Sequence, residues 1–198
     1  MTNLDSRDDA TQGLHQAKLP QTPLAGPYGH PFHPLLVTVP IGAWISSLVF
    51  DIATRAKNNG SQQLVYGAWW LILIGIIGAG VAALFGLMDL SRLRRRSRAL
   101  RAGLVHMTLN LLVLAAFVVN VIWRYDAHTT DTKVRGGQLA LSAVALGVLA
   151  ISGWIGGMLS YRFGVRVAEE ADQLTAYESY GTGARGDTTR ATTTGRHG

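Results

Sequence analysis

Four long stretches without a charged residue dominate the hydropathy pattern of the chain. They cover 35–50, 64–88, 102–123 and 136–161. About 20 mainly apolar residues cross the hydrocarbon core of a bilayer as a helix. The last three stretches reach this length by themselves, and the first reaches it with the residues that flank it. The pattern therefore predicts four transmembrane helices, over about 34–54, 63–90, 102–123 and 136–161.

A soluble four-helix bundle is excluded, because each of its helices would show a charged face. The expected fold is an all-α four-helix transmembrane bundle made of antiparallel hairpins, and Asn58-Asn59-Gly60 is a turn signal between the first two helices. We expect a membrane domain over 28–168. The polar segments 1–27 and 169–198 have few bulky apolar residues and are predicted to be a disordered N-terminal arm and a disordered cytoplasmic tail.

Positive charges predict how the bundle is oriented. The connection between the second and third helices carries six arginines, and short arginine-rich loops stay in the cytoplasm: Arg92, Arg94, Arg95, Arg96, Arg98 and Arg101. Both termini are then cytoplasmic as well, and the expected location is the bacterial inner membrane. The net charge of +6 is interpreted as a topology signal with affinity for anionic lipid. Nucleic acid is not an expected partner, because basic and aromatic residues do not interleave.

The candidate chemistry lies on the predicted cytoplasmic side. The chain has no cysteine, which excludes disulfides, thiolate-bound metals and covalently attached c-type haem. Ionisable groups at membrane depth are rare and often mark function. Imidazole and carboxylate suit transition metals, and two histidines suit the iron of haem b. We predict three histidine ligands, a carboxylate that binds the metal or orients a histidine, and two supporting side chains: His30, His33 and His106, then Asp89, then Asn110 and Tyr161.

Each of these residues also has a purely structural interpretation. His106 would make one hydrogen bond across helices, and His30 and His33 would lie among lipid headgroups. Asp89 would pair with a loop arginine, Arg92 or Arg101. At the other side of the membrane, Asp51 is expected to pair with Arg55, four residues on, as a surface contact of the first helix.

The same residues carry a family resemblance. The run Gly29-His30-Pro31-Phe32-His33-Pro34, with Gly86-x-x-Asp89 and His106-x-x-x-Asn110, resembles the bacterial membrane family known as domain of unknown function 2231. The resemblance covers about residues 28 to 168. It implies no settled activity. Some family members are joined to Rieske-type iron–sulfur domains, which implies redox work. Because this chain has no cysteine, the iron–sulfur or other redox partner would be a separate protein.

Three functions follow from these observations. The first is a redox or metal- or haem-binding membrane subunit that uses the histidines. The second is a non-catalytic scaffold or accessory subunit that binds lipids, partner helices or further copies of the chain. The third is a small proton or metal transporter that uses Asp51 and Asn120 towards the outer side. No enzyme is assigned, because no nucleophile triad, phosphate loop or dinucleotide fingerprint is present.

Overall fold

The computed structural model describes residues 3–19 and 32–167, and within these ranges every regular element is a helix. The predicted all-α fold is confirmed. The helices, in chain order, are α1 (Asn3–Lys18), α2 (Phe32–Leu36), α3 (Thr38–Ala56), α4 (Gln62–Ser91), α5 (Arg98–Trp123) and α6 (Gly136–Tyr161).

Four of the described segments are long and apolar enough to cross a membrane: α2 together with α3, then α4, α5 and α6. They match the four predicted spans, and α6 has the predicted bounds. The first span begins at Phe32 and is interrupted at Val37. Pro40 follows three residues later and has no N–H for the first turn of α3. The Val37 amide still donates to the His33 carbonyl at 3.1 Å, which ties the short α2 to α3.

Helix α1 lies within residues 1–27, the segment for which the sequence predicts a disordered arm. It contains no proline, and its last turn carries Lys18, whose positive charge favours a helix C-terminus. The Ala17 carbonyl accepts a hydrogen bond of 3.0 Å from the Arg166 amide, just after α6. The predicted tail over 169–198 lies outside the described residues, as does His30.

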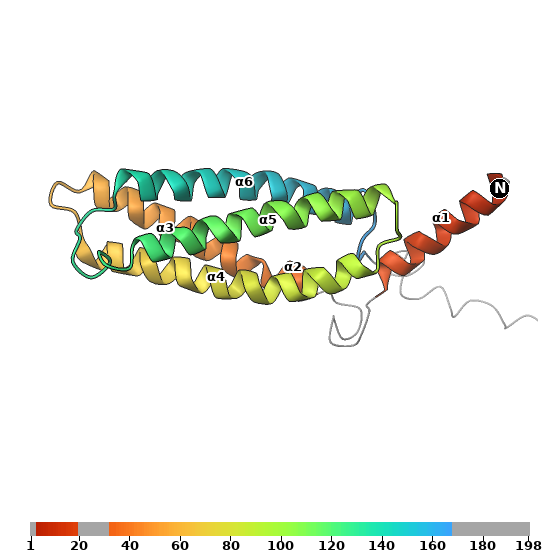
Figure 1. The fold of residues 1–198 in the computed structure, drawn as a ribbon, viewed down its shortest axis with the longest axis horizontal. Helices are drawn as coiled ribbons and strands as arrows, with labels where there is room; N and C mark the ends of the chain where they lie inside the picture. Colours follow the sequence, from red (N-terminus) through yellow and green to blue (C-terminus); the bar gives the residue numbers. More distant parts are fainter. Residues whose placement is uncertain (1–2, 20–31, 168–198) are drawn as a thin grey trace, which may run out of the picture. The chain divides into compact units, whose positions relative to one another are not determined.

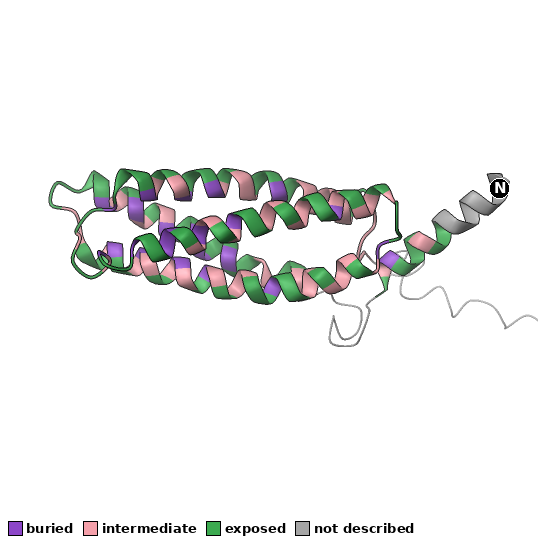
Figure 2. Ribbon diagram, viewed as in Figure 1, coloured by how far each residue is buried: buried purple, intermediate pink, exposed green. Residues whose placement is uncertain are grey.

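The four spanning helices pack as two antiparallel hairpins, α3–α4 and α5–α6 (Figure 1). Contacts of α4 with α5 and of α3 with α6 close the bundle, so that α3 and α5 face each other across its centre. There the Trp44 and Phe117 rings stack, with centroids 4.2 Å apart and planes 10° from parallel. Ile72, Val113, Val121 and Ala145 complete this core. Figure 2 shows exposed residues along the outward faces of all four helices, as lipid contact requires for apolar side chains.

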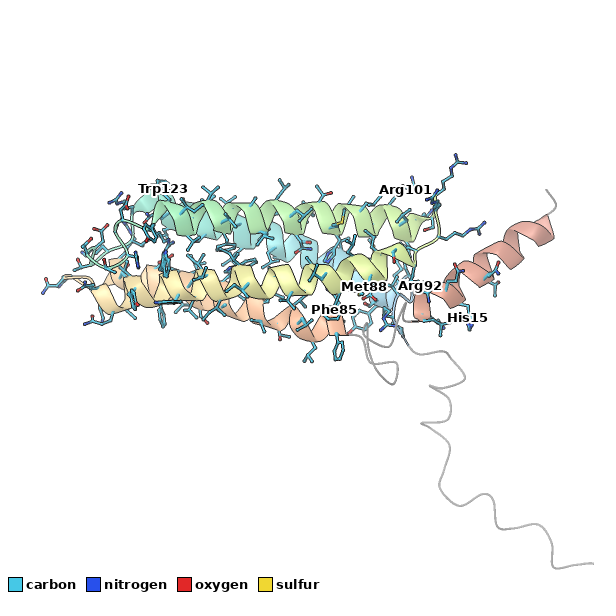
Figure 3. The ribbon with its side chains drawn as sticks, turned by 60° about the horizontal axis from the view of Figure 1, so that its bottom comes forward. His15, Phe85, Met88, Arg92, Arg101 and Trp123 are labelled. Atoms are coloured by element: carbon cyan, nitrogen blue, oxygen red, sulfur yellow. The ribbon has the colours of Figure 1, made fainter. Side chains whose placement is uncertain are left out.

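The two ends of the bundle differ in composition. Figure 3 shows Trp123 at one end and Arg101 and Arg92 at the other. We call the end that carries the connection 92–97 the arginine-rich end. Helix α2 begins there, α4 ends there, α5 begins there and α6 ends there. The opposite end carries the connections 57–61 and 124–135.

Candidate functional site

Two histidines from different hairpins meet near the arginine-rich end of the bundle. His33 lies on α2 and His106 lies in the third turn of α5. Their ring centroids are 6.5 Å apart and the ring planes are nearly perpendicular, at 85°. The two residues are 73 positions apart in the chain, so only the packing of one hairpin against the other brings the rings together.

Each imidazole is held by a backbone carbonyl of its own hairpin. The Nδ1 atom of His33 lies 2.9 Å from the Ala82 oxygen on α4. The Nδ1 atom of His106 lies 2.8 Å from the Ser152 oxygen on α6. A carbonyl oxygen only accepts hydrogen bonds, so each Nδ1 carries the proton and donates it. In a neutral imidazole the Nε2 atom then keeps its lone pair, which is the form that binds metal ions.

A glycine lies one helical turn beyond each of these carbonyls. A Cβ atom on Gly86 of α4 would lie 2.9 Å from Cε1 of His33, and one on Gly156 of α6 would lie 2.9 Å from Cε1 of His106. Both separations are too short for an undisturbed contact. The glycines therefore let each ring lie directly against the backbone of the facing helix.

Gly156 and its neighbour Gly157 offer a matched test of this contact. We expect Gly156→Ala to displace the His106 ring and to lower the free energy of unfolding by about 1–3 kcal/mol, the usual cost of overpacking. Gly157→Ala meets nothing within 4 Å and should be neutral or stabilise by up to about 1 kcal/mol, because alanine is the better helix former. Unfolding of both variants in detergent measures the difference. Equal stabilities would show that the ring does not depend on Gly156.

Asn110 and Ser152 complete the surroundings of His106. The Asn110 Nδ2 atom lies 3.1 Å from Nε2 of His106 and donates to the Ser152 hydroxyl at 2.8 Å. The Ser152 hydroxyl is also 3.3 Å from the His106 carbonyl. The structure thus brings Asn110 to His106 and joins α5 to α6 through polar groups.

The other predicted site residues are arranged differently. Asp89 forms an ion pair with Arg166, with a Nε–Oδ1 distance of 3.2 Å, a partner that the sequence analysis did not predict. Tyr161, which was predicted as a supporting side chain, lies at the end of α6 and is 94 % exposed. Within residues 3–19 and 32–167, no group of three or more histidine, aspartate or glutamate side chains is arranged to hold a metal ion.

A second polar cluster is buried between the hairpins nearer the opposite end. Asp51 of α3 is fully buried and accepts two hydrogen bonds of 2.7 Å from the guanidinium of Arg124, which follows α5. This corrects the predicted surface pair of Asp51 with Arg55. The Arg55 side chain instead donates to the Val134 carbonyl at 3.1 Å. The correct partner lies 73 residues away in the chain.

Amide and hydroxyl groups satisfy the rest of the Arg124 guanidinium. Its Nε donates to Asn120 Oδ1 at 2.8 Å, and one terminal nitrogen lies 3.3 Å from the Ser142 hydroxyl. Asn120 in turn donates to the Ser142 hydroxyl and to the Gln138 carbonyl. Arg124 was not predicted as a buried residue, because it directly follows an uncharged stretch and resembles an ordinary interfacial arginine.

The two clusters share a pattern that identifies the chain as two similar hairpins in tandem. Residues of α2 and α3 that point inwards have inward-pointing counterparts 73 positions on, in and after α5. They are His33 with His106, Pro40 with Val113, Trp44 with Phe117, Ser47 with Asn120, Asp51 with Arg124 and Thr54 with Ala127. Helices α4 and α6 correspond in the same way at 70 positions: Ala68 with Gln138, Ile72 with Ser142, Gly75 with Ala145, Ala82 with Ser152 and Gly86 with Gly156.

This correspondence explains why both histidines have the same surroundings. A parallel repeat related by an axis along the membrane normal places equivalent residues on either side of the bundle centre. The packing of His33 against Ala82 and Gly86 is the counterpart of the packing of His106 against Ser152 and Gly156. Comparison of the chain with itself at an offset of 73 residues is the sequence signal that finds Arg124 as the counterpart of Asp51.

Residues 29–169 match the family model described as predicted membrane protein, DUF2231. The chain belongs to this family. The match includes both hairpins, both histidines and the buried ion pair. No curated protein and no solved structure matches the chain.

Proposed function

We propose that this DUF2231 protein is a membrane subunit that binds a transition-metal ion or a haem iron between His33 and His106. One observation carries the proposal. Two imidazoles from separate hairpins come within 6.5 Å of each other, and each is oriented by a backbone carbonyl at its Nδ1 atom, so that in the neutral ring the lone pair is on Nε2. Metal-binding histidines commonly donate their second ring nitrogen in this manner, which fixes the tautomer and the ring orientation.

The separation of the rings suits two ligands of one metal. Metal–imidazole bonds are about 2.0–2.1 Å long, so two Nε2 atoms on one ion lie at most about 4 Å apart. Ring centroids 6.5 Å apart are compatible with this geometry once the rings turn towards the same point. Imidazole favours zinc, copper, iron and nickel. With haem, the two histidines would be the protein ligands that hold the iron.

A bare ion requires further ligands beside the two histidines. Asp89 lies one turn beyond Gly86, which the His33 ring contacts, and would exchange its bond to Arg166 for the metal. His30 lies outside the described residues. The Asn110 amide lies against Nε2 of His106 and would have to turn aside. With iron or copper bound, the activity would be electron transfer to a separate redox protein.

A scaffold or accessory subunit is the second candidate, and a different observation favours it. Both ring nitrogens of His106 already have partners in the described residues, Ser152 and Asn110, and these contacts join α5 to α6. Buried polar groups in membrane helices often serve only such packing. In this case His106 stabilises the second hairpin and binds nothing.

An optical spectrum and metal analysis of the detergent-purified protein decide between the two candidates. We expect a Soret band or stoichiometric metal in the wild type and a loss of at least about tenfold in His33→Ala and in His106→Ala, because each variant removes one of two ligands. His128→Ala is the matched control. His128 stacks on Trp69 at the opposite end, with centroids 4.4 Å apart, so this variant should keep the cofactor. A wild-type protein without chromophore or metal after supplementation would refute the binding proposal and favour the scaffold.

A further inference from the structure

The tandem hairpins raise the question of what makes them pair with each other. Their inward faces occupy equivalent positions, so the first hairpin of one chain can meet either the second hairpin of its own chain or the first hairpin of another copy in the same arrangement. Aromatic residues occupy one equivalent pair of positions, Trp44 and Phe117, and small or amide residues occupy the next, Ser47 and Asn120. Neither layer opposes the pairing of like hairpins.

The next layer does distinguish the two hairpins. Asp51 and Arg124 are equivalent positions with opposite charges; Asp51 is fully buried and Arg124 is 2 % exposed. When unlike hairpins pair, the two side chains form two hydrogen bonds of 2.7 Å. When like hairpins pair, this layer contains two carboxylates or two guanidinium groups without a counter-charge. Burial of such unpaired charges is strongly unfavourable.

We infer that the Asp51–Arg124 pair is a recognition element that makes each first hairpin pair only with a second hairpin. Its partner is the second hairpin of the same chain, and a second hairpin from another copy would present the same surface. The cost of charge burial acts against the wrong partner, as buried polar residues do in coiled coils. This inference does not depend on whether the histidines bind a cofactor.

Complementary charge variants of the full-length chain test this recognition. One tagged chain carries Asp51→Arg, so that both of its hairpins present a cation at this layer. A second chain with a different tag carries Arg124→Asp, so that both of its hairpins present a carboxylate. Each variant alone has only like charges at the centre of its bundle. Produced together, every hairpin of one chain finds an opposite charge on the alternate hairpin of the other.

We expect the mixed pair to co-purify in detergent at least about ten times more than the wild-type pair with the same two tags. A factor of ten corresponds to about 1.4 kcal/mol. This is less than the cost of leaving one charge of a buried ion pair without its partner. Each variant produced with its own copy should show no such enrichment. Equal recovery of the mixed and wild-type pairs would overturn the inference, as would equal recovery of like-charged pairs.

A neutral variant provides a second, independent measurement. Asp51→Leu combined with Arg124→Met removes both charges while keeping side-chain volume at this layer, a replacement that buried ion pairs often tolerate. Without the charges this layer no longer disfavours the pairing of like hairpins, so co-purification of this variant with its own copy should rise at least about tenfold over wild type. Recovery at the wild-type value would show that other contacts select the partner and would overturn the inference.

Discussion

Asp51→Ala is expected to lower the free energy of unfolding by about 3–5 kcal/mol, because it leaves a buried guanidinium without its counter-charge. Arg124 is 2 % exposed, and both of its terminal nitrogens lie 2.7 Å from the Asp51 carboxylate. The Asn120 and Ser142 groups that remain around Arg124 are neutral. Unfolding in mixed detergent and dodecyl sulfate measures the loss.

The exposed ion pair of Asp131 and Arg135 is the matched control. It also joins aspartate to arginine, at 3.5 Å, but the side chains are 34 % and 57 % exposed. Asp131→Ala should therefore cost less than about 1 kcal/mol. The double variant Asp51→Leu/Arg124→Met should recover most of the stability that Asp51→Ala loses, because no buried charge remains. A cost for Asp51→Ala no larger than for Asp131→Ala would show that water or lipid headgroups reach Arg124.

The positions of the spanning helices were predictable from the sequence for one physical reason. A charged side chain in the hydrocarbon core is costly, so the uncharged stretches mark where the chain can cross the bilayer. Helix α6 spans Gly136–Tyr161, which are the bounds of its uncharged stretch. Helix α4 exceeds its own uncharged stretch, 64–88, by only a few residues at each end. Helix α1 is not subject to this constraint, and its residues were predicted to be disordered.

The inward face of each helix was not predictable in the same manner. In a soluble protein the apolar face points inwards, but lipid is as apolar as any protein core. Here polar residues point inwards: Ser47, Asp51, Thr54, Asn120, Ser142 and Ser152 are all fully buried, whereas Trp154 is 81 % exposed. The difference between the predicted supporting role of Tyr161 and its exposure has this origin. A shared membrane side says nothing about which face of a helix a residue occupies.

The candidate site was predictable only in part because its contacts are long-range. His33 and His106 were expected within reach of each other because both were predicted on the same side of the membrane. The i,i+4 spacing brings Asn110 to His106. The same local rule paired Asp51 with Arg55 and was wrong there. The carbonyls of Ala82 and Ser152 leave no mark on the sequence, since every residue has one. The glycines four residues after these carbonyls can be seen in the sequence, but they do not single out the site, because glycine is frequent in membrane helices.

The second large effect is expected at Gly75, where α4 passes closest to Trp44. A Cβ atom at this position would lie 2.2 Å from Nε1 and 2.5 Å from Cδ1 of Trp44. The indole has little freedom to move away, because it stacks on Phe117 and donates to the Ile72 carbonyl at 3.2 Å. We expect Gly75→Ala to destabilise the bundle by about 1–3 kcal/mol through overpacking.

Gly80 of the same helix is the control. It is exposed and a Cβ atom there meets nothing within 4 Å, so Gly80→Ala should be neutral or stabilise by up to about 1 kcal/mol. Unfolding of both variants under the same detergent conditions measures the difference. Equal effects would contradict the close approach of α4 to Trp44.

The second hairpin indicates how the loss at Gly75 can be recovered. The counterparts of Trp44 and Gly75 are Phe117 and Ala145, which lie in the same core cluster. A larger aromatic ring thus accompanies glycine in one hairpin, and a smaller ring accompanies alanine in the other. Trp44→Phe should therefore restore part of the stability of Gly75→Ala, because it removes the indole nitrogen that a Cβ atom would meet. If the double variant instead loses the full stability cost of both single substitutions, the two positions are not coupled. The side-chain volumes of the two hairpins would then not be matched layer by layer.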